Sequence, residues 1–88
     1  MVLQDSEQFL AKLQKGGRIQ VPRLVRWKNR LEAGEIFVVK VFNSVSQTFY
    51  GRFCMDGRIS IPKNVREELK IEPGHLLTVR LNPIKRDL

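Results

Sequence analysis

The feature that most constrains this chain is an internal duplication with an offset of forty residues. Residues 57–81 read GRISIPKNVREELKIEPGHLLTVRL, and residues 17–41 read GRIQVPRLVRWKNRLEAGEIFVVKV in the same register. Over residues 6–42, eleven of thirty-seven positions are identical to the residue forty places later. The identical residues of the first copy are Ser6, Phe9, Gly17, Arg18, Ile19, Pro22, Val25, Arg26, Glu32, Gly34 and Val39. A fixed period indicates repeated structural units, which predicts one unit over residues 6–42, a second over 46–82, and a tail over 83–88.

The length of the chain requires the two units to share one core. A chain of 88 residues buries only about 60 to 65% of its unfolded surface, so neither half can hold a core alone. Residues 1–88 are therefore expected to form a single domain. The beginning, MVLQDSEQFLAKL, lacks the basic start and apolar run of a signal peptide, and no stretch of about eighteen apolar residues follows. We expect a soluble, cytoplasmic monomer with internal pseudo-symmetry and no association with membranes, with a higher oligomer as the alternative.

Each unit is predicted to form a strand, a second strand, a helix and a third strand. Residues 6–15 alternate as a strand does but also suit a helix, and the copy SQTFYGRFCM, which is poor helix, favours the strand. Short strands at 18–21 and 58–61 end at Pro22 and Pro62, which cannot donate to a ladder but fit the first turn of a helix. The helices expected there span 23–31 and 63–70, and the third strands span 36–42 and 76–81. Six short strands and two small helices predict a mostly β protein, a closed six-stranded barrel with pseudo-two-fold symmetry.

Three finer expectations follow from the apolar positions. The first helix should dock on the sheet through Leu24, Val25, Trp27 and Leu31, with Trp27 either covering the gap at Asn29 or lying exposed. The strand at 36–42 is almost entirely apolar and should be covered on both faces. Residues 43–47 should form a short link between the two units.

The second copy resembles the SpoVT-AbrB family of prokaryotic DNA-binding transcription factors. The residues that carry the resemblance are Gly57, Arg58, Ile59, Ile61, Pro62, Val65, Arg66, Leu69, Ile71, Gly74 and Leu77, and the first copy departs from the pattern at Asn29 and Phe37. Family members are usually homodimers whose units each have a fourth strand, for which this chain has no residues. It looks instead like the related single-chain barrels of the cradle-loop group, with the RIFT type favoured over the double-psi type.

The charge and the resemblance together indicate nucleic acid as the partner. The net charge is +7, of which residues 18–44 contribute +4 and residues 45–88 contribute +3. Such a balance favours nucleic acid or another acidic surface. The resemblance implies that Arg18, Arg26, Arg58 and Arg66 contact double-stranded DNA in pseudo-symmetric pairs. It suggests Lys12 and Arg52 as a further pair, and the neighbouring cations expected within reach of phosphates are Arg23, Lys28, Arg30 and Lys63.

Other interpretations of the same residues stay open. An arginine beside a tight turn also caps carbonyl groups or pairs with Glu32 or Glu72, which is a purely structural function. The leading hypothesis is a DNA-binding protein and transcription regulator. The alternatives are a non-catalytic barrel that docks on an acidic protein and, less favoured because the tail is short and not acidic, an antitoxin. No catalytic constellation appears, so neither an enzyme nor a cofactor is expected, and a single cysteine, Cys54, with a single histidine, His75, disfavours a structural zinc.

Overall fold

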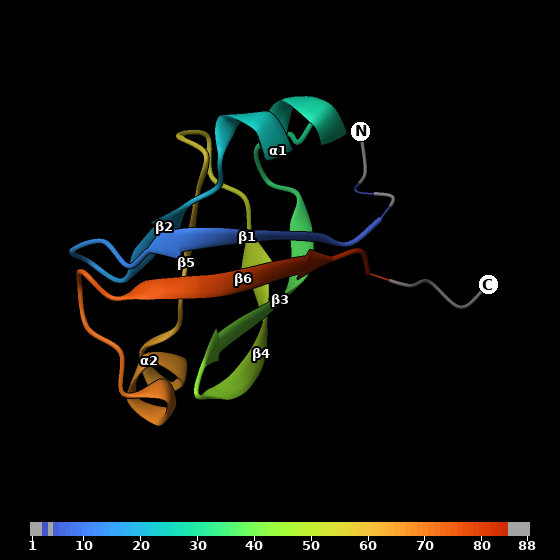
Figure 1. Cartoon of the computed structure of the whole chain (residues 1–88). Coiled ribbons are helices and arrows are strands. Elements are labelled where there is room, and N and C mark those ends of the chain that lie inside the picture. Colours follow the sequence, from blue (N-terminus) through green and yellow to red (C-terminus); the bar gives the residue numbers. More distant parts are fainter. Residues whose placement is uncertain (1–2, 4, 85–88) are drawn as a thin grey trace.

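The chain forms six strands and two short helices in the computed structural model, which describes residue 3 and residues 5–84 (Figure 1). The elements are β1 (Glu7–Lys12), β2 (Arg18–Gln20), α1 (Arg23–Asn29), β3 (Ile36–Asn43), β4 (Val45–Arg52), β5 (Arg58–Ser60), α2 (Lys63–Leu69) and β6 (Leu76–Asn82). The expectation of a mostly β domain with two short helices is confirmed. Most of the predicted tail, residues 85–88, lies outside the described residues.

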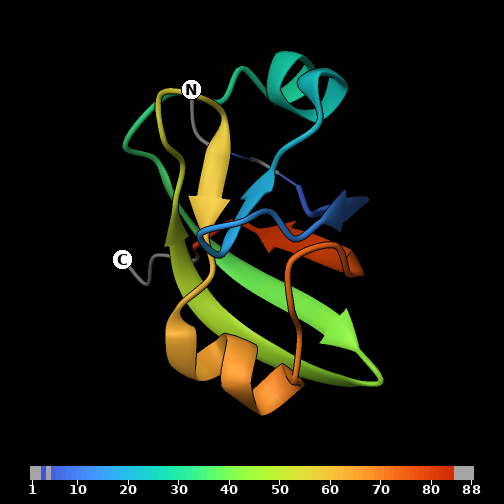
Figure 2. The ribbon, with the colours of Figure 1, turned by 90° about the vertical axis from the view of Figure 1, so that its left-hand side faces the viewer.

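The strands pair in two antiparallel sheets. One has four strands in the order β1-β6-β3-β4, and the other is the two-stranded ribbon β2-β5 (Figure 2). The sequence predicted one closed six-stranded barrel, whereas the ladders define two separate sheets. β2 and β5 have only three residues each and end two residues before Pro22 and Pro62, so there is little strand left to continue a ladder on either side.

The register of the ladders follows the forty-residue offset. Phe9 pairs with Val79 between β1 and β6, and Phe49 pairs with Val39 between β4 and β3. At two places a residue pairs with its own counterpart, because Lys40 faces Arg80 and a buried pair, Ile19 and Ile59, joins β2 to β5. A pseudo-two-fold axis therefore passes through these two pairs. Every ladder between named strands joins one copy to the other.

The core lies between the two sheets and comes from alternate residues of the strands. Its fully buried members from the third strands are Phe37, Val39, Val41, Leu77, Val79 and Leu81. β3 was expected to be covered on both faces, and this is wrong, since Ile36 is 43% exposed and Val38 and Phe42 are only partly buried. β3 thus buries one face, as β6 does.

The two helices begin and end alike but pack differently. Each follows a proline at φ −56° and ends at a left-handed residue, Arg30 in α1 and Lys70 in α2. α2 buries Val65 and Leu69, whereas α1 buries no residue. The expected docking of α1 through Leu24 is therefore wrong, because this side chain is 76% exposed. Of the two alternatives for Trp27, the structure has the exposed one, at 82%.

Asn29 explains the looser packing of α1. It stands where α2 has the buried Leu69, and its amide donates to Glu7 Oε1 (3.1 Å) and to the carbonyl of Val25 (2.9 Å). A polar contact with β1 thus replaces the apolar contact that holds α2. Only Val25 and Leu31 of this segment pack, partly buried, against the core.

The connection between the two copies is tighter than expected. β3 and β4 form a hairpin whose pairing runs up to Asn43 and Val45, so the link is Ser44 alone, at φ +67°, rather than residues 43–47. Within the described part of the chain, no helix is long and apolar enough to cross a membrane.

Candidate nucleic-acid interface

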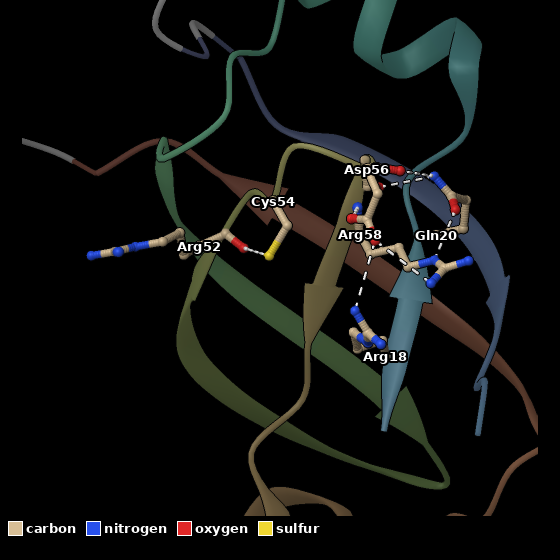
Figure 3. Close-up of polar contacts among 7 residues, drawn as sticks. Arg18, Gln20, Arg52, Cys54, Asp56 and Arg58 are labelled. Atoms are coloured by element: carbon tan, nitrogen blue, oxygen red, sulfur yellow. Dashed lines mark hydrogen bonds and ion pairs between the residues drawn. The ribbon is translucent and has the colours of Figure 1, made fainter. Parts of the chain in front are cut away.

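The ribbon β2-β5 brings two of the predicted arginines onto one surface. Ile19 and Ile59 face the core, so their neighbours Arg18 and Arg58 point outward on the other side of the ribbon. Arg18 faces Ser60 across the ladder and Arg58 faces Gln20. Figure 3 shows these side chains together at the surface of the ribbon. Residues forty apart in the sequence thus form one basic cluster.

A single carboxylate lies between the two guanidinium groups. Asp56 Oδ2 is 3.7 Å from Arg18 Nη1 and 3.6 Å from Arg58 Nη1, and the three side chains are 43%, 37% and 45% exposed for Arg18, Arg58 and Asp56. Gln20 adds to the cluster, since its Oε1 accepts from Arg58 Nε (3.3 Å) and its amide donates to the carbonyl of Gly57 (3.1 Å). Exposed ion pairs contribute only about 0 to 1 kcal/mol each, so Asp56 is a weak competitor for these cations.

Arg26 and Arg66 do something different, because each packs against a glycine of the other copy. A Cβ on Gly17 would lie 2.6 Å from Arg66 Cζ, and a Cβ on Gly57 would lie 2.6 Å from Arg26 Cζ. Arg66 Nε also donates to the carbonyl of Ile61 (3.0 Å), and the Arg26 guanidinium lies 5.8 Å from the centre of the Phe53 ring. The structural interpretation, an arginine that caps a carbonyl beside a turn, describes the contact of Arg66.

Lys12 and Arg52 are not near the ribbon cluster. Both project from the outer face of the four-stranded sheet, and Figure 3 shows Arg52 pointing away from Arg18 and Arg58. This face also carries Lys40 and Arg80, which the sequence reasoning missed. Both cations lie over the ring of Phe42, at 5.2 Å for Lys40 Nζ and 5.9 Å for Arg80 Cζ. The alternation of β3 and β6 predicts that both side chains point outward, whereas their meeting depends on the pairing of the two strands.

The remaining predicted cations lie on the helices. Lys28 pairs with Glu7 Oε1 at 3.2 Å, and Lys63 pairs with Glu67 at 4.0 Å within α2. Arg23 and Arg30 line an open groove of about 710 Å³ on α1. The other lining residues are Arg26, Trp27, Leu31 and Glu32. Trp27 is exposed in this groove.

Glu7 is the acidic residue beneath α1, and its charged form is stabilised there. The hydrogen bond from Asn29 lowers the pKa of the Glu7 carboxyl below its ordinary value of 4.5, and Lys28 lowers it further through a hydrogen bond and its charge. Partial burial opposes both effects. Glu7 is thus an anion at neutral pH and holds Lys28 close to β1.

Comparison with known proteins gives a match in structure. No family model matches the chain, and no curated protein matches it. The solution structure of PHS018 from Pyrococcus horikoshii is similar, with 28% sequence identity and a TM-score of 0.77. The similarity covers 100% of this chain and 99% of that one. It supports the small, mostly β fold with two helices described above.

Proposed function

We propose that this protein binds duplex DNA through the outer face of the ribbon β2-β5 and acts as a transcription regulator. The observation that carries the proposal is the pair Arg18 and Arg58, which the ribbon holds close enough for both to contact one carboxylate of Asp56. A site that holds one anionic oxygen between two guanidinium groups suits a phosphate oxygen equally well. Arginine suits phosphate and guanine because its planar fork donates two parallel hydrogen bonds.

The shape of the site agrees with this function. The major groove of B-DNA admits a two-stranded β ribbon, and the two cations are related by the pseudo-two-fold axis that crosses this ribbon at Ile19 and Ile59. A duplex has two-fold axes of its own, so the two copies would meet similar phosphates on the two strands.

The same proposal includes kinship with the SpoVT-AbrB group and a RIFT-type closed barrel. Two contacts support closure, because they join the first strand of each copy to its short strand. Gln14 N donates to the carbonyl of Arg18 (2.8 Å), and Cys54 N donates to the carbonyl of Arg58 (2.9 Å). In a closed barrel these two contacts would link the two sheets.

The test is the salt dependence of binding to a labelled blunt duplex, measured by fluorescence anisotropy. The variant Arg18→Ala/Arg58→Ala should bind more weakly, and the slope of log affinity against log salt should fall by about 0.9 for each lost phosphate contact. The variant Lys12→Ala/Arg52→Ala is the matched control, since it removes the same charge from the outer face of the four-stranded sheet. It should keep most of the affinity and the slope.

A further variant tests the ribbon from the other direction. Asp56→Asn removes the competing carboxylate while keeping the size of the side chain, and it should raise the affinity for duplex on the order of two- to fivefold at low salt. If Arg18→Ala/Arg58→Ala and Lys12→Ala/Arg52→Ala lost equal affinity for the duplex, binding would depend on net charge alone. Absence of salt-dependent duplex binding by the unmodified protein would reject the proposal.

A further inference from the structure

α1 exposes apolar side chains that its counterpart does not have. Leu24 is 76% exposed and Trp27 is 82% exposed, and the equivalent positions of α2 hold Asn64 and Glu67. α2 keeps the same helix length and the same left-handed end with these polar residues. The fold therefore does not require a tryptophan or a leucine at these positions. The difference between the copies points to a function confined to α1.

Trp27 lies in a groove between cations. The groove of about 710 Å³ includes Arg23, Arg26 and Arg30 among its lining residues, against one acidic residue, Glu32. Arg23 and Arg30 are four residues before and three residues after Trp27, which places all three on one side of the helix. The equivalent groove on α2 is about 340 Å³ and includes both Glu67 and Glu72. Of these two grooves, the one on α1 combines an exposed aromatic ring with an excess of arginine.

This groove is continuous with the ribbon. Arg26 lines it, and the Arg26 guanidinium lies within 2.6 Å of where a Cβ of Gly57 would stand. Gly57 follows Asp56, the residue that Arg18 and Arg58 contact. A strand of nucleic acid that leaves the ribbon at Asp56 therefore meets Arg26 next and then the α1 groove.

We propose that the α1 groove binds an unpaired segment of DNA adjoining the duplex, with a base stacked on Trp27 and the flanking phosphates held by Arg23 and Arg30. Every base has a stacking face, and an aromatic side chain in a basic groove is the usual site for unpaired bases. The inference rests on the proposed DNA binding and narrows the target to a junction between paired and unpaired DNA.

An acidic protein is the less suitable occupant. A stable protein interface buries about 800 Å² on each partner and has an apolar centre. The exposed apolar surface of α1 consists of Leu24 and Trp27 and is interrupted by charged residues at every turn. These two side chains offer a stacking surface for a base but not the apolar centre of such an interface.

The experiment uses the fluorescence of Trp27, which is the single tryptophan of the chain. The full-length protein is titrated with a blunt duplex and with the same duplex carrying a single-stranded thymidine overhang. The overhang should quench Trp27 and raise the affinity on the order of tenfold over the blunt duplex. Trp27→Ala should reduce this advantage to less than about twofold, and Trp27→Phe should keep most of it, since a phenyl ring still stacks.

Two controls separate the groove from the rest of the molecule. Tyr50→Ala removes a ring that is 74% exposed on β4, outside the groove, and should leave the overhang advantage unchanged. The double variant Leu24→Asn/Trp27→Glu gives α1 the residues of α2 and should unfold at the same denaturant concentration as the unmodified protein.

The outcomes distinguish the two proposals. Equal affinity for blunt and overhanging duplexes, with Trp27 fluorescence unchanged, would overturn the proposed binding of unpaired DNA by the groove. It would leave the proposed binding of duplex by the ribbon unaffected. Quenching by polyglutamate as strong as that by the overhang would overturn it in favour of an acidic protein. Overhang binding that survives Arg18→Ala/Arg58→Ala undiminished would support the groove and reject the ribbon.

Discussion

At the scale of single residues, an arginine of each copy packs against a glycine of the other copy. Gly17 has φ +79° and the Arg66 guanidinium where its side chain would be, and Gly57 with Arg26 repeats the arrangement. Glycine is favoured there for two reasons, the positive φ and the guanidinium group that a side chain would have to displace. The sequence showed both arginines and both glycines, but nothing in it showed that they meet across the pseudo-two-fold axis.

The neighbouring glycines 16 and 17 allow these two reasons to be separated. Gly17→Ala should destabilise the protein by about 2 to 4 kcal/mol, because it adds the loss of the Arg66 contact to the backbone strain. Gly16→Ala has the same kind of strain at φ +91° but open space at its Cβ, and should cost only about 1 to 2 kcal/mol. Urea unfolding of both variants measures the difference. Equal losses would mean that the Arg66 contact contributes nothing to stability.

Glu7 gives the protein a predictable response to acid. Because the folded state lowers the pKa of Glu7 below 4.5, the ionised carboxylate stabilises the fold above that pH, and this contribution disappears as the pH falls through the folded pKa. Asn29→Ala removes the largest cause of the shift. Its free energy of unfolding should therefore change less between pH 6 and pH 3 than that of the unmodified protein.

Asn64→Ala on α2 is the control for this pH experiment. It removes an exposed amide at a helix without altering the surroundings of Glu7. Its pH dependence should match that of the unmodified protein. If the pH dependence of Asn29→Ala also matched that of the unmodified protein, the hydrogen bond from Asn29 to Glu7 would contribute nothing to stability.

At the scale of elements, the pairing of β3 with β6 places two cations face to face. Lys40 and Arg80 are directly opposite each other in the ladder, where like charges are destabilising. Lys40→Glu should stabilise the protein by about 0.5 to 1 kcal/mol at low salt, and the gain should shrink as salt screens the charges. Thermal unfolding at two salt concentrations measures it. Lys12→Glu is the control, because it makes the same change of charge opposite the uncharged Leu76. If it stabilised the protein equally, the effect of Lys40→Glu would come from net charge and not from the pair with Arg80.

The elements themselves were largely predictable, and the errors have specific causes. Pro22 and Pro62 correctly marked the change from strand to helix, because proline cannot donate to a strand ladder but fits the first turn of a helix. The docking of α1 was predicted wrongly because the prediction considered its apolar residues alone. Asn29 makes a polar contact with Glu7 of β1, which is far away in the sequence. The alternation of each short strand predicted that Arg18 and Arg58 point outward. That they lie side by side depends on the pairing of β2 with β5, and the meeting of Lys40 with Arg80 depends likewise on the pairing of β3 with β6.

At the scale of the whole molecule, the duplication predicted a shared core but not how the strands divide between the two sheets. Pairing depends on which strands come closest once the chain has folded, and no local pattern reports that. The ladders between named strands all run from one copy to the other, so each copy by itself has strands without partners.

Separated halves test this dependence. Peptides covering residues 1–44 and 45–88 should each be unfolded at low concentration, because β1, β2 and β3 form no ladder with one another. Mixing them, or raising the concentration of either, should produce strand signal by circular dichroism that depends on concentration. A single half that melts cooperatively with a midpoint independent of concentration would show that one copy holds a core alone.

The pairing of β1 with β6 has a consequence for how the protein is made. A ribosome releases β1 early, but its partner emerges some seventy residues later, at Leu76–Asn82. Until then the Phe9, Ala11 and Leu13 side chains of the nascent chain have no sheet to cover them. The sheet that contains β1 therefore cannot form until β6 has been synthesised, whereas both strands of the hairpin β3-β4 and of the ribbon β2-β5 emerge earlier.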